Sequence, residues 1–172
     1  MARPRARLSL KGRALQLLAQ RDQSRLELRG KLLRYAAAEA RARAAEVEEG
    51  AGGATDEPDD EGGRRHEEVE ALLDWLEANR FLSAERFAES RVHARETRFG
   101  NRRIRAELAQ HGVALSPEVA QALAESELQR AAAVRERRFQ GPPKDAAERA
   151  TQARFLAGRG FSPEVIQRVL RR

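Results

Sequence analysis

Apolar residues recur at helical spacing along most of the chain. The clearest example is Val69, Leu72, Leu73 and Leu76, which follow one another at i, i+3, i+4 and i+7. That spacing predicts an amphipathic helix with one apolar face. The same pattern predicts further helices at about 13–20, 24–47, 84–98, 102–111, 117–124, 125–139, 145–158 and 162–170.

The composition favours helices over strands. Val, Ile and Thr together contribute only 13 of the 172 residues, and aromatic residues make up 5%. These are the residue types that fill pleated sheets, whereas the abundant Ala, Leu, Glu, Arg and Gln are good helix formers. Ser24, followed by Glu27, also has the spacing of a capping box at a helix start. We therefore expect an all-α protein.

The sequence contains an internal repeat. Leu115-Ser-Pro-Glu-Val119 and Phe161-Ser-Pro-Glu-Val165 share four identical residues at the start of a helix. Upstream of them, residues 103–112 align with 151–160, and residues 27–36 fall on the same template. We expect three tandem three-helix repeats that stack into an elongated, curved array with a shared core. The alternative is a single irregular helical bundle in which the Ser-Pro-Glu-Val match is accidental.

The repeats and the charge pattern together predict the domain organisation. We expect a basic N-terminal arm at 1–11 and three-helix units at 12–78, 83–124 and 125–172. Residues 46–63 carry eight acidic and no basic side chains, and they include five glycines. Such a segment predicts a flexible acidic insertion, at about 46–65, inside the first unit. Without residues 46–63 the net charge of the chain is +14, which favours polyanionic partners, nucleic acid first.

Residues suited to catalysis or metal binding do not form a pattern. The chain has no cysteine, and His66, His93 and His111 lack the spacing of metal ligands. No glycine-rich phosphate loop and no nucleophile elbow occurs. We therefore expect a binding protein without catalytic residues, metal or other cofactors. No apolar run is long enough to cross a membrane and no signal peptide is recognisable, which predicts a cytoplasmic protein that contacts no membrane.

Two clusters of arginines are the candidate binding residues. The first is Arg21, Arg25 and Arg29, and the second is Arg91, Arg95, Arg98, Arg102, Arg103 and Arg105. Most of these residues lack an acidic neighbour three or four positions away; in the first cluster Arg21 and Arg29 are expected to be unpaired, and in the second only Arg103 has such a neighbour, Glu107. Unpaired guanidinium groups suit phosphate or carboxylate ligands. The alternatives are a solvated surface or acidic partners supplied by another unit.

Two aromatic residues lie beside these arginines in the sequence. Tyr35 follows the first cluster and Phe99 lies within the second. Either ring could stack on a nucleic-acid base. The alternative is that both rings make ordinary core or cap contacts.

Several runs in fixed order resemble the RecX family. They are Arg13-Ala-Leu-Gln-Leu-Leu-Ala, Ser24-Arg-Leu-Glu-Leu-Arg-Gly-Lys-Leu, Leu73-Asp-Trp-Leu-Glu-Ala-Asn-Arg-Phe-Leu-Ser83, Phe99-Gly-Asn-Arg-Arg-Ile-Arg-Ala-Glu-Leu108 and the closing Gly-Phe-Ser-Pro-Glu-Val-Ile. The resemblance implies a regulator that lies in the groove of the RecA–DNA filament and inhibits ATP hydrolysis, strand exchange and coprotease activity. It also implies tandem three-helix units, in some cases with contacts to single- or double-stranded DNA. We expect the chain to be a monomer. The acidic segment 46–63 departs from the family pattern.

A second class of function is an autonomous DNA-binding protein with a helix-turn-helix. The charge and the helix spacing permit this interpretation. Reading a base sequence requires side chains such as Asn or Gln on a recognition helix. Only Asn101 and Gln110 are candidates, and neither is well placed.

Overall fold

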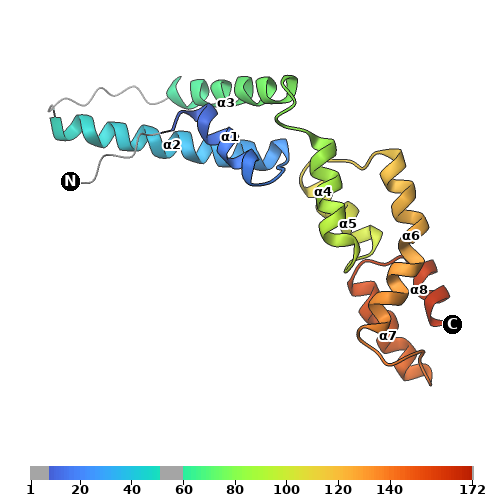
Figure 1. The fold of residues 1–172 in the computed structure, drawn as a ribbon. Coiled ribbons are helices and arrows are strands. Elements are labelled where there is room, and N and C mark those ends of the chain that lie inside the picture. Colours follow the sequence, from blue (N-terminus) through green and yellow to red (C-terminus); the bar gives the residue numbers. More distant parts are fainter. Residues whose placement is uncertain (1–7, 51–59, 172) are drawn as a thin grey trace. The chain divides into compact units, whose positions relative to one another are not determined.

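The computed structural model describes residues 8–50 and 60–171, and every regular element in these ranges is an α-helix (Figure 1). The helices are α1 (Leu10–Gln20), α2 (Arg25–Gly50), α3 (Asp60–Ala78), α4 (Ala84–Glu96), α5 (Asn101–Gln110), α6 (Pro117–Glu136), α7 (Ala146–Gly158) and α8 (Pro163–Leu170). The predicted all-α class is thereby confirmed. None of these helices is both long enough and apolar enough to span a bilayer. The chain divides into two compact units, Met1–Ala84 and Glu85–Arg172.

The first unit is built on α1, α2 and α3. α2 and α3 lie side by side and run in opposite directions (Figure 1). Their apolar faces meet α1 in one core, made of Ala14, Leu28, Leu32, Val69, Leu73, Leu76 and Leu82. Burying a leucine side chain fully contributes about 1.5–3 kcal/mol, so this shared core holds the three helices together.

The first helix begins earlier than expected. α1 starts at Leu10 rather than at Arg13, because the Ser9 hydroxyl accepts a hydrogen bond from the Gly12 amide at 3.1 Å and caps the helix. Tyr35 then donates its hydroxyl to the carbonyl oxygen of Leu8 at 2.5 Å. The basic arm expected at 1–11 is therefore structured from Leu8 onward, and residues 1–7 lie outside the described residues.

Both ends of the flexible acidic insertion expected at 46–63 are helical instead. α2 continues to Gly50 and α3 already begins at Asp60, while residues 51–59 lie outside the described residues. The end of α2 is rich in alanine and glutamate, which favour helix propagation. Glu61 lies in the first turn of α3, where negative charge stabilises the helix dipole.

The second unit contains two apolar clusters that share one helix. Side chains of α4 and α5 pack with Leu123 near the start of α6. Side chains of α7 and α8 pack with Ala131 and Val134 near its end. α6 is therefore the third helix of one repeat and the first helix of the next. The break predicted near residue 124 is wrong, because no glycine or proline follows Pro117 within the helix and both halves gain a core to pack on.

Both helices that open with Ser-Pro-Glu begin where the sequence predicts. α6 starts at Pro117, with the Ser116 hydroxyl accepting a hydrogen bond from the Val119 amide at 3.3 Å. α8 starts at Pro163 with Ser162 as its N-cap residue. A side-chain cap sets the start of α6, whereas the Ser162 hydroxyl makes no capping hydrogen bond and α8 begins with a proline in its first turn.

Candidate functional site: the arginines of α4 and α5

The first predicted arginine cluster is paired with acidic residues of α3. The Arg25 guanidinium lies 2.7 Å from a carboxylate oxygen of Glu70, 2.8 Å from Asp74 and 2.7 Å from Glu77. Arg29 also pairs with Glu70. The hydrogen bonds from Arg25 and Arg29 lower the pKa of Glu70, and those that Arg25 makes raise its own pKa although burial opposes this. The prediction that Arg29 is unpaired is wrong, because its partner is on another helix.

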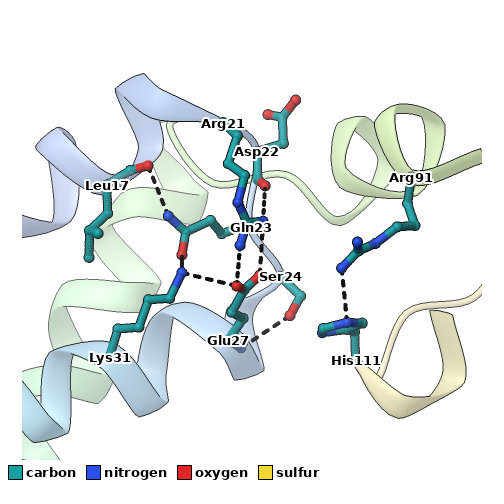
Figure 2. A network of polar contacts seen from close by, with 9 residues as sticks. All are labelled: Leu17, Arg21, Asp22, Gln23, Ser24, Glu27, Lys31, Arg91 and His111. Carbon is teal, nitrogen blue, oxygen red and sulfur yellow. Dashed lines mark hydrogen bonds and ion pairs between the residues drawn. The ribbon is translucent and has the colours of Figure 1, made fainter. Parts of the chain in front are cut away.

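Arg21 is paired as well, with Glu27 one turn into α2. Figure 2 shows the Glu27 carboxylate accepting hydrogen bonds from Arg21 and Lys31, while the Glu27 backbone amide donates to the Ser24 hydroxyl. Burial alone would raise the pKa of Glu27, but the hydrogen bonds from Arg21 and Lys31 outweigh it and lower this pKa to about 2. The expected free charge of Arg21 is thus absent, and Ser24 caps α2 through its hydroxyl at 3.1 Å from the Glu27 amide.

Three members of the second cluster also have partners. Glu107 of α5 accepts hydrogen bonds from Arg95 of α4 at 3.0 Å and from Arg103 at 3.5 Å. Arg91 donates to the Nε2 atom of His111 at 3.2 Å (Figure 2). One carboxylate therefore serves two guanidinium groups, which leaves a positive balance on this surface.

The remaining three arginines carry the uncompensated charge. Arg98, Arg102 and Arg105 are exposed, and none of them forms an ion pair with any residue that the structure describes. Arg102 and Arg105 are three positions apart on α5, so their side chains leave the same face of the helix. We call the set Arg95, Arg98, Arg102, Arg103 and Arg105 the α4–α5 arginine cluster.

The Phe99 ring lies among these guanidinium groups. The guanidinium carbon of Arg103 is 4.4 Å from the ring centroid, and those of Arg95 and Arg98 are 5.7 and 5.9 Å away. Phe99 is half-buried against the α4–α5 core. The ring therefore acts both as a core contact and as a platform that orients the cations over its face.

The turn before α5 is anchored on the turn before α8. The Gly100 amide donates to the Arg159 carbonyl at 2.9 Å, and the Arg102 amide donates to the Gly160 carbonyl at 3.0 Å. A Cβ atom on Gly100 would lie only 2.3 Å from the Phe161 nitrogen. Gly160 has a φ of +81°, which suits glycine. The third repeat thus holds the backbone that carries Arg102 and Arg103.

A buried carboxylate of α6 joins the same two turns. Glu127 is 5% exposed and accepts hydrogen bonds from the Asn101 amide at 3.0 Å and from the Ser162 amide at 3.3 Å. Its second oxygen accepts from the Ser162 hydroxyl at 3.2 Å. The charge therefore lies at the N-termini of both α5 and α8, where two helix dipoles stabilise it.

Arg130, one turn further along α6, binds the end of α4. Its guanidinium donates to the Phe99 carbonyl at 2.8 Å, to the Glu96 carbonyl at 3.1 Å and to the Asn101 side chain. Burial lowers the pKa of Arg130, and the nearby carboxylates of Glu127 and Glu96 oppose that shift. The positioning roles of Glu127 and Arg130 escaped the sequence analysis. The sequence signal for these roles is the i, i+3 spacing of Glu127 and Arg130 in the alanine-rich helix α6.

Two family models match the second unit. The family model described as the second three-helix domain of RecX matches residues 85–123, and the model of the third three-helix domain matches residues 125–170. The regulatory protein RecX of Ralstonia nicotianae is 45% identical over 172 residues, covering 99% of this chain and 91% of the relative. The chain belongs to the RecX family. The regulatory protein RecX of Herbaspirillum seropedicae is 44% identical, covering 95% of this chain and 90% of the relative.

A solved RecX structure has the same fold. The crystal structure of RecX from Lactobacillus salivarius superposes with a TM-score of 0.60 over 94% of this chain and 92% of that chain. Its sequence identity of 15% makes this a likeness of fold alone. The RecX relatives are named as regulatory proteins, so the chain is a member of a family of regulators.

The chain offers no metal site in the part that the structure describes. No group of three His, Asp or Glu side chains within residues 8–50 and 60–171 is placed to hold an ion. The histidines make other contacts: His93 lies 3.7 Å from Glu96, and the Nδ1 atom of His66 lies 3.1 Å from the Gly62 carbonyl. What the site offers chemically is a set of fixed cations beside an aromatic ring.

Proposed function

We propose that the chain binds the RecA–DNA filament and inhibits the recombinase, ATPase and coprotease activities of RecA, and so modulates DNA repair and the SOS response. It would act in the cytoplasm, as a monomer, by binding rather than by catalysis. Membership of the RecX family over nearly the whole chain supports the proposal. The observation that carries the assignment of a surface is the uncompensated charge of Arg98, Arg102 and Arg105.

The α4–α5 arginine cluster suits such a partner for a physical reason. Guanidinium groups form paired, charge-assisted hydrogen bonds with carboxylates and phosphates, and the filament presents both. The turn that carries Arg102 is held by Gly160, Glu127 and Arg130, so little backbone freedom is lost on binding. Arg91 lies at the edge of the cluster, against Phe87 and His111.

The first arginine cluster is a weaker candidate for the partner-binding surface than the α4–α5 arginine cluster. Arg21, Arg25 and Arg29 remain predicted partner contacts, but their guanidinium groups already serve carboxylates of α2 and α3. Binding a partner there would require those pairs to be shared or broken. We therefore place the main contact in the second unit.

A double charge reversal tests this assignment. With Arg102→Glu and Arg105→Glu together, inhibition of ATP hydrolysis by RecA filaments should be lost, because two cations on one face become anions. Helicity by circular dichroism should stay unchanged, since both side chains are exposed. The matched control is Arg41→Glu with Arg154→Glu, which reverses two exposed arginines on α2 and α7. Equal inhibition by the two double variants would contradict the proposal.

The alternative, an autonomous DNA-binding protein, loses one of its two candidate base readers. Asn101 is 7% exposed, and its side chain donates to the Leu123 carbonyl at 3.0 Å and accepts from Arg130. Its amide is therefore engaged inside the protein. Gln110 alone remains exposed, at the end of α5. A sequence-dependent footprint on duplex DNA would favour this alternative.

A further inference from the structure

A second concentration of positive charge lies in the first unit, apart from the α4–α5 arginine cluster. An open cavity of about 380 Å³ lies between α1 and α2 and is lined by Arg13, Leu17, Lys31, Arg34 and Tyr35. Three of these five side chains are cationic and none is acidic. The volume is near the lower end of the ~300–1,000 Å³ found for small-molecule sites.

The positive charge of the cavity is only partly compensated. Arg13 donates to the neutral Gln16 side chain at 2.7 Å. Arg34 is exposed and has no ion pair with the residues that the structure describes. Lys31 donates to Glu27 and to Gln23, at 2.9 Å in each case (Figure 2). An ammonium group has three N–H donors, so one remains for a ligand.

The carboxylate that pairs with Lys31 is already shared. Glu27 accepts hydrogen bonds from Arg21 as well as from Lys31, so its single negative charge serves two cations. Gln23, which is buried, donates to the Leu17 carbonyl at 2.8 Å and holds its oxygen toward Lys31. The contacts of Lys31 with Gln23 and Glu27, drawn in Figure 2, hold its ammonium group in place.

An aromatic and an aliphatic side chain complete the lining. The Tyr35 hydroxyl is fixed by its hydrogen bond to the Leu8 carbonyl, and the Arg13 guanidinium carbon lies 5.7 Å from the ring centroid. Leu17 supplies an apolar contact. Cations beside an aromatic ring form the combination that binds the phosphate and the base of a nucleotide.

We propose that this cavity binds one nucleotide, with its phosphate on Arg13, Lys31 and Arg34 and its base against Tyr35 and Leu17. The nucleotide is either free or part of a single-stranded nucleic acid, because both carry the same chemistry. An acidic peptide is disfavoured, since a carboxylate side chain has no aromatic face to stack on the Tyr35 ring. The proposal is independent of the proposed function, because the cavity lies wholly in the first unit.

The test compares two charge-neutralising pairs in the full chain by fluorescence anisotropy with a fluorescein-labelled oligothymidylate. Arg13→Gln with Arg34→Gln should weaken binding at least about tenfold, because two charge-assisted contacts are lost. It should also reduce the slope of log affinity against log salt by about 0.7 for each lost contact. The control, Arg41→Gln with Arg43→Gln, removes the same charge from α2 outside the cavity and should change both quantities little.

Further measurements identify the ligand and test the role of the Tyr35 ring in the cavity lining. Unlabelled thymidine monophosphate that displaces the oligonucleotide indicates a site for free nucleotides; displacement by unlabelled oligothymidylate alone indicates the polynucleotide. Tyr35→Leu should weaken binding in either case. Three outcomes overturn the proposal: no binding by the unmodified chain, equal loss in the two double variants, or displacement by polyglutamate as readily as by oligothymidylate. The fold-loss caused by Arg13→Gln with Arg34→Gln should be the same in the Arg102→Glu, Arg105→Glu background, so failure here is distinguishable from failure of the proposed function.

Discussion

Single residues at the junction of α5 and α8 determine how the second unit holds its arginines. A buried carboxylate is costly unless hydrogen bonds and favourable dipoles offset the loss of water. Glu127 meets both conditions, since it accepts from Asn101 and Ser162 at two helix N-termini. Gly100 brings the two turns together because it has no side chain at their point of contact. The positions of the exposed arginines on α5 thus depend on two residues that are themselves buried, Gly100 and Glu127.

Gly100→Ala should break this junction. The new methyl group would lie 2.3 Å from the Phe161 nitrogen and 2.4 Å from the Gly160 carbonyl carbon, and backbone atoms cannot turn aside. We expect the unfolding free energy to fall by about 1–3 kcal/mol, as in other overpacked sites. Gly158→Ala is the control, because a Cβ there meets nothing within 4 Å in the last turn of α7. Urea denaturation followed by circular dichroism measures both; equal stabilities would show that the close approach is relaxed.

At the scale of elements, helices are paired by charge as well as by apolar contact. Arg25 of α2 forms ion pairs with three carboxylates of α3, those of Glu70, Asp74 and Glu77. Arg29 of α2 pairs with Glu70 as well. The three carboxylates are spaced one helical turn apart, so they would repel one another without the arginines. The side chains are partly exposed, and the network therefore adds modestly to the apolar core.

Acid should weaken this pairing. The pKa of Glu70 is lowered by Arg25 and Arg29, below the value of about 4.3 for an unfolded glutamate. The pKa of Glu27, which pairs with Arg21 and Lys31 at the start of α2, is lowered to about 2. Stability from these groups is therefore complete above pH ~5 and declines as the pH falls toward 2. Arg25→Met should lower the unfolding free energy by about 1 kcal/mol near neutral pH, and the difference from the unmodified chain should shrink in acid.

The single tryptophan makes this measurable. Trp75 lies in α3, so its fluorescence during urea denaturation reports on the first unit. Arg41→Met is the control, because Arg41 is exposed on α2 and has no ion pair with the described residues. A difference between Arg25→Met and the unmodified chain that stays constant with pH would contradict the electrostatic explanation.

At the scale of the whole molecule, two units with separate cores present separate charged surfaces. The first unit carries the α1–α2 cavity and the second carries the α4–α5 arginine cluster. Outside residues 46–63 the chain has a net charge of +14, so it attracts polyanions in general. For specific regulation, the affinity for the RecA–DNA filament must therefore exceed the affinity for free DNA.

A comparison of two binding targets measures that excess. The chain is added to preassembled RecA filaments on single-stranded DNA near physiological salt, and ATP hydrolysis is followed while binding to free DNA is measured in parallel. We expect inhibition well below the concentration that saturates free DNA, because the proposed target is the filament. Inhibition only at saturation of the DNA would indicate a general DNA-binding protein instead.

The sequence by itself determined the features that depend on neighbours along the chain. Apolar spacing predicted α3, Ser116 and Ser162 predicted the starts of α6 and α8, and composition excluded strands from the expected fold. The repeat predicted tandem three-helix units, in agreement with the RecX domains matched in the second half. These signals are local, because caps and helix faces are set within a few residues.

Only the tertiary structure decided which charges are free. The partner of Arg29 is Glu70, 41 positions away, and that of Arg95 is Glu107 on the next helix. Likewise, the continuity of α6 follows from the two cores that it joins, which spacing alone did not show. Ion pairs and core contacts depend on distance in space, and a helical sequence specifies faces without specifying which faces meet. The exposed charge of Arg98, Arg102 and Arg105 is therefore a property of the folded chain.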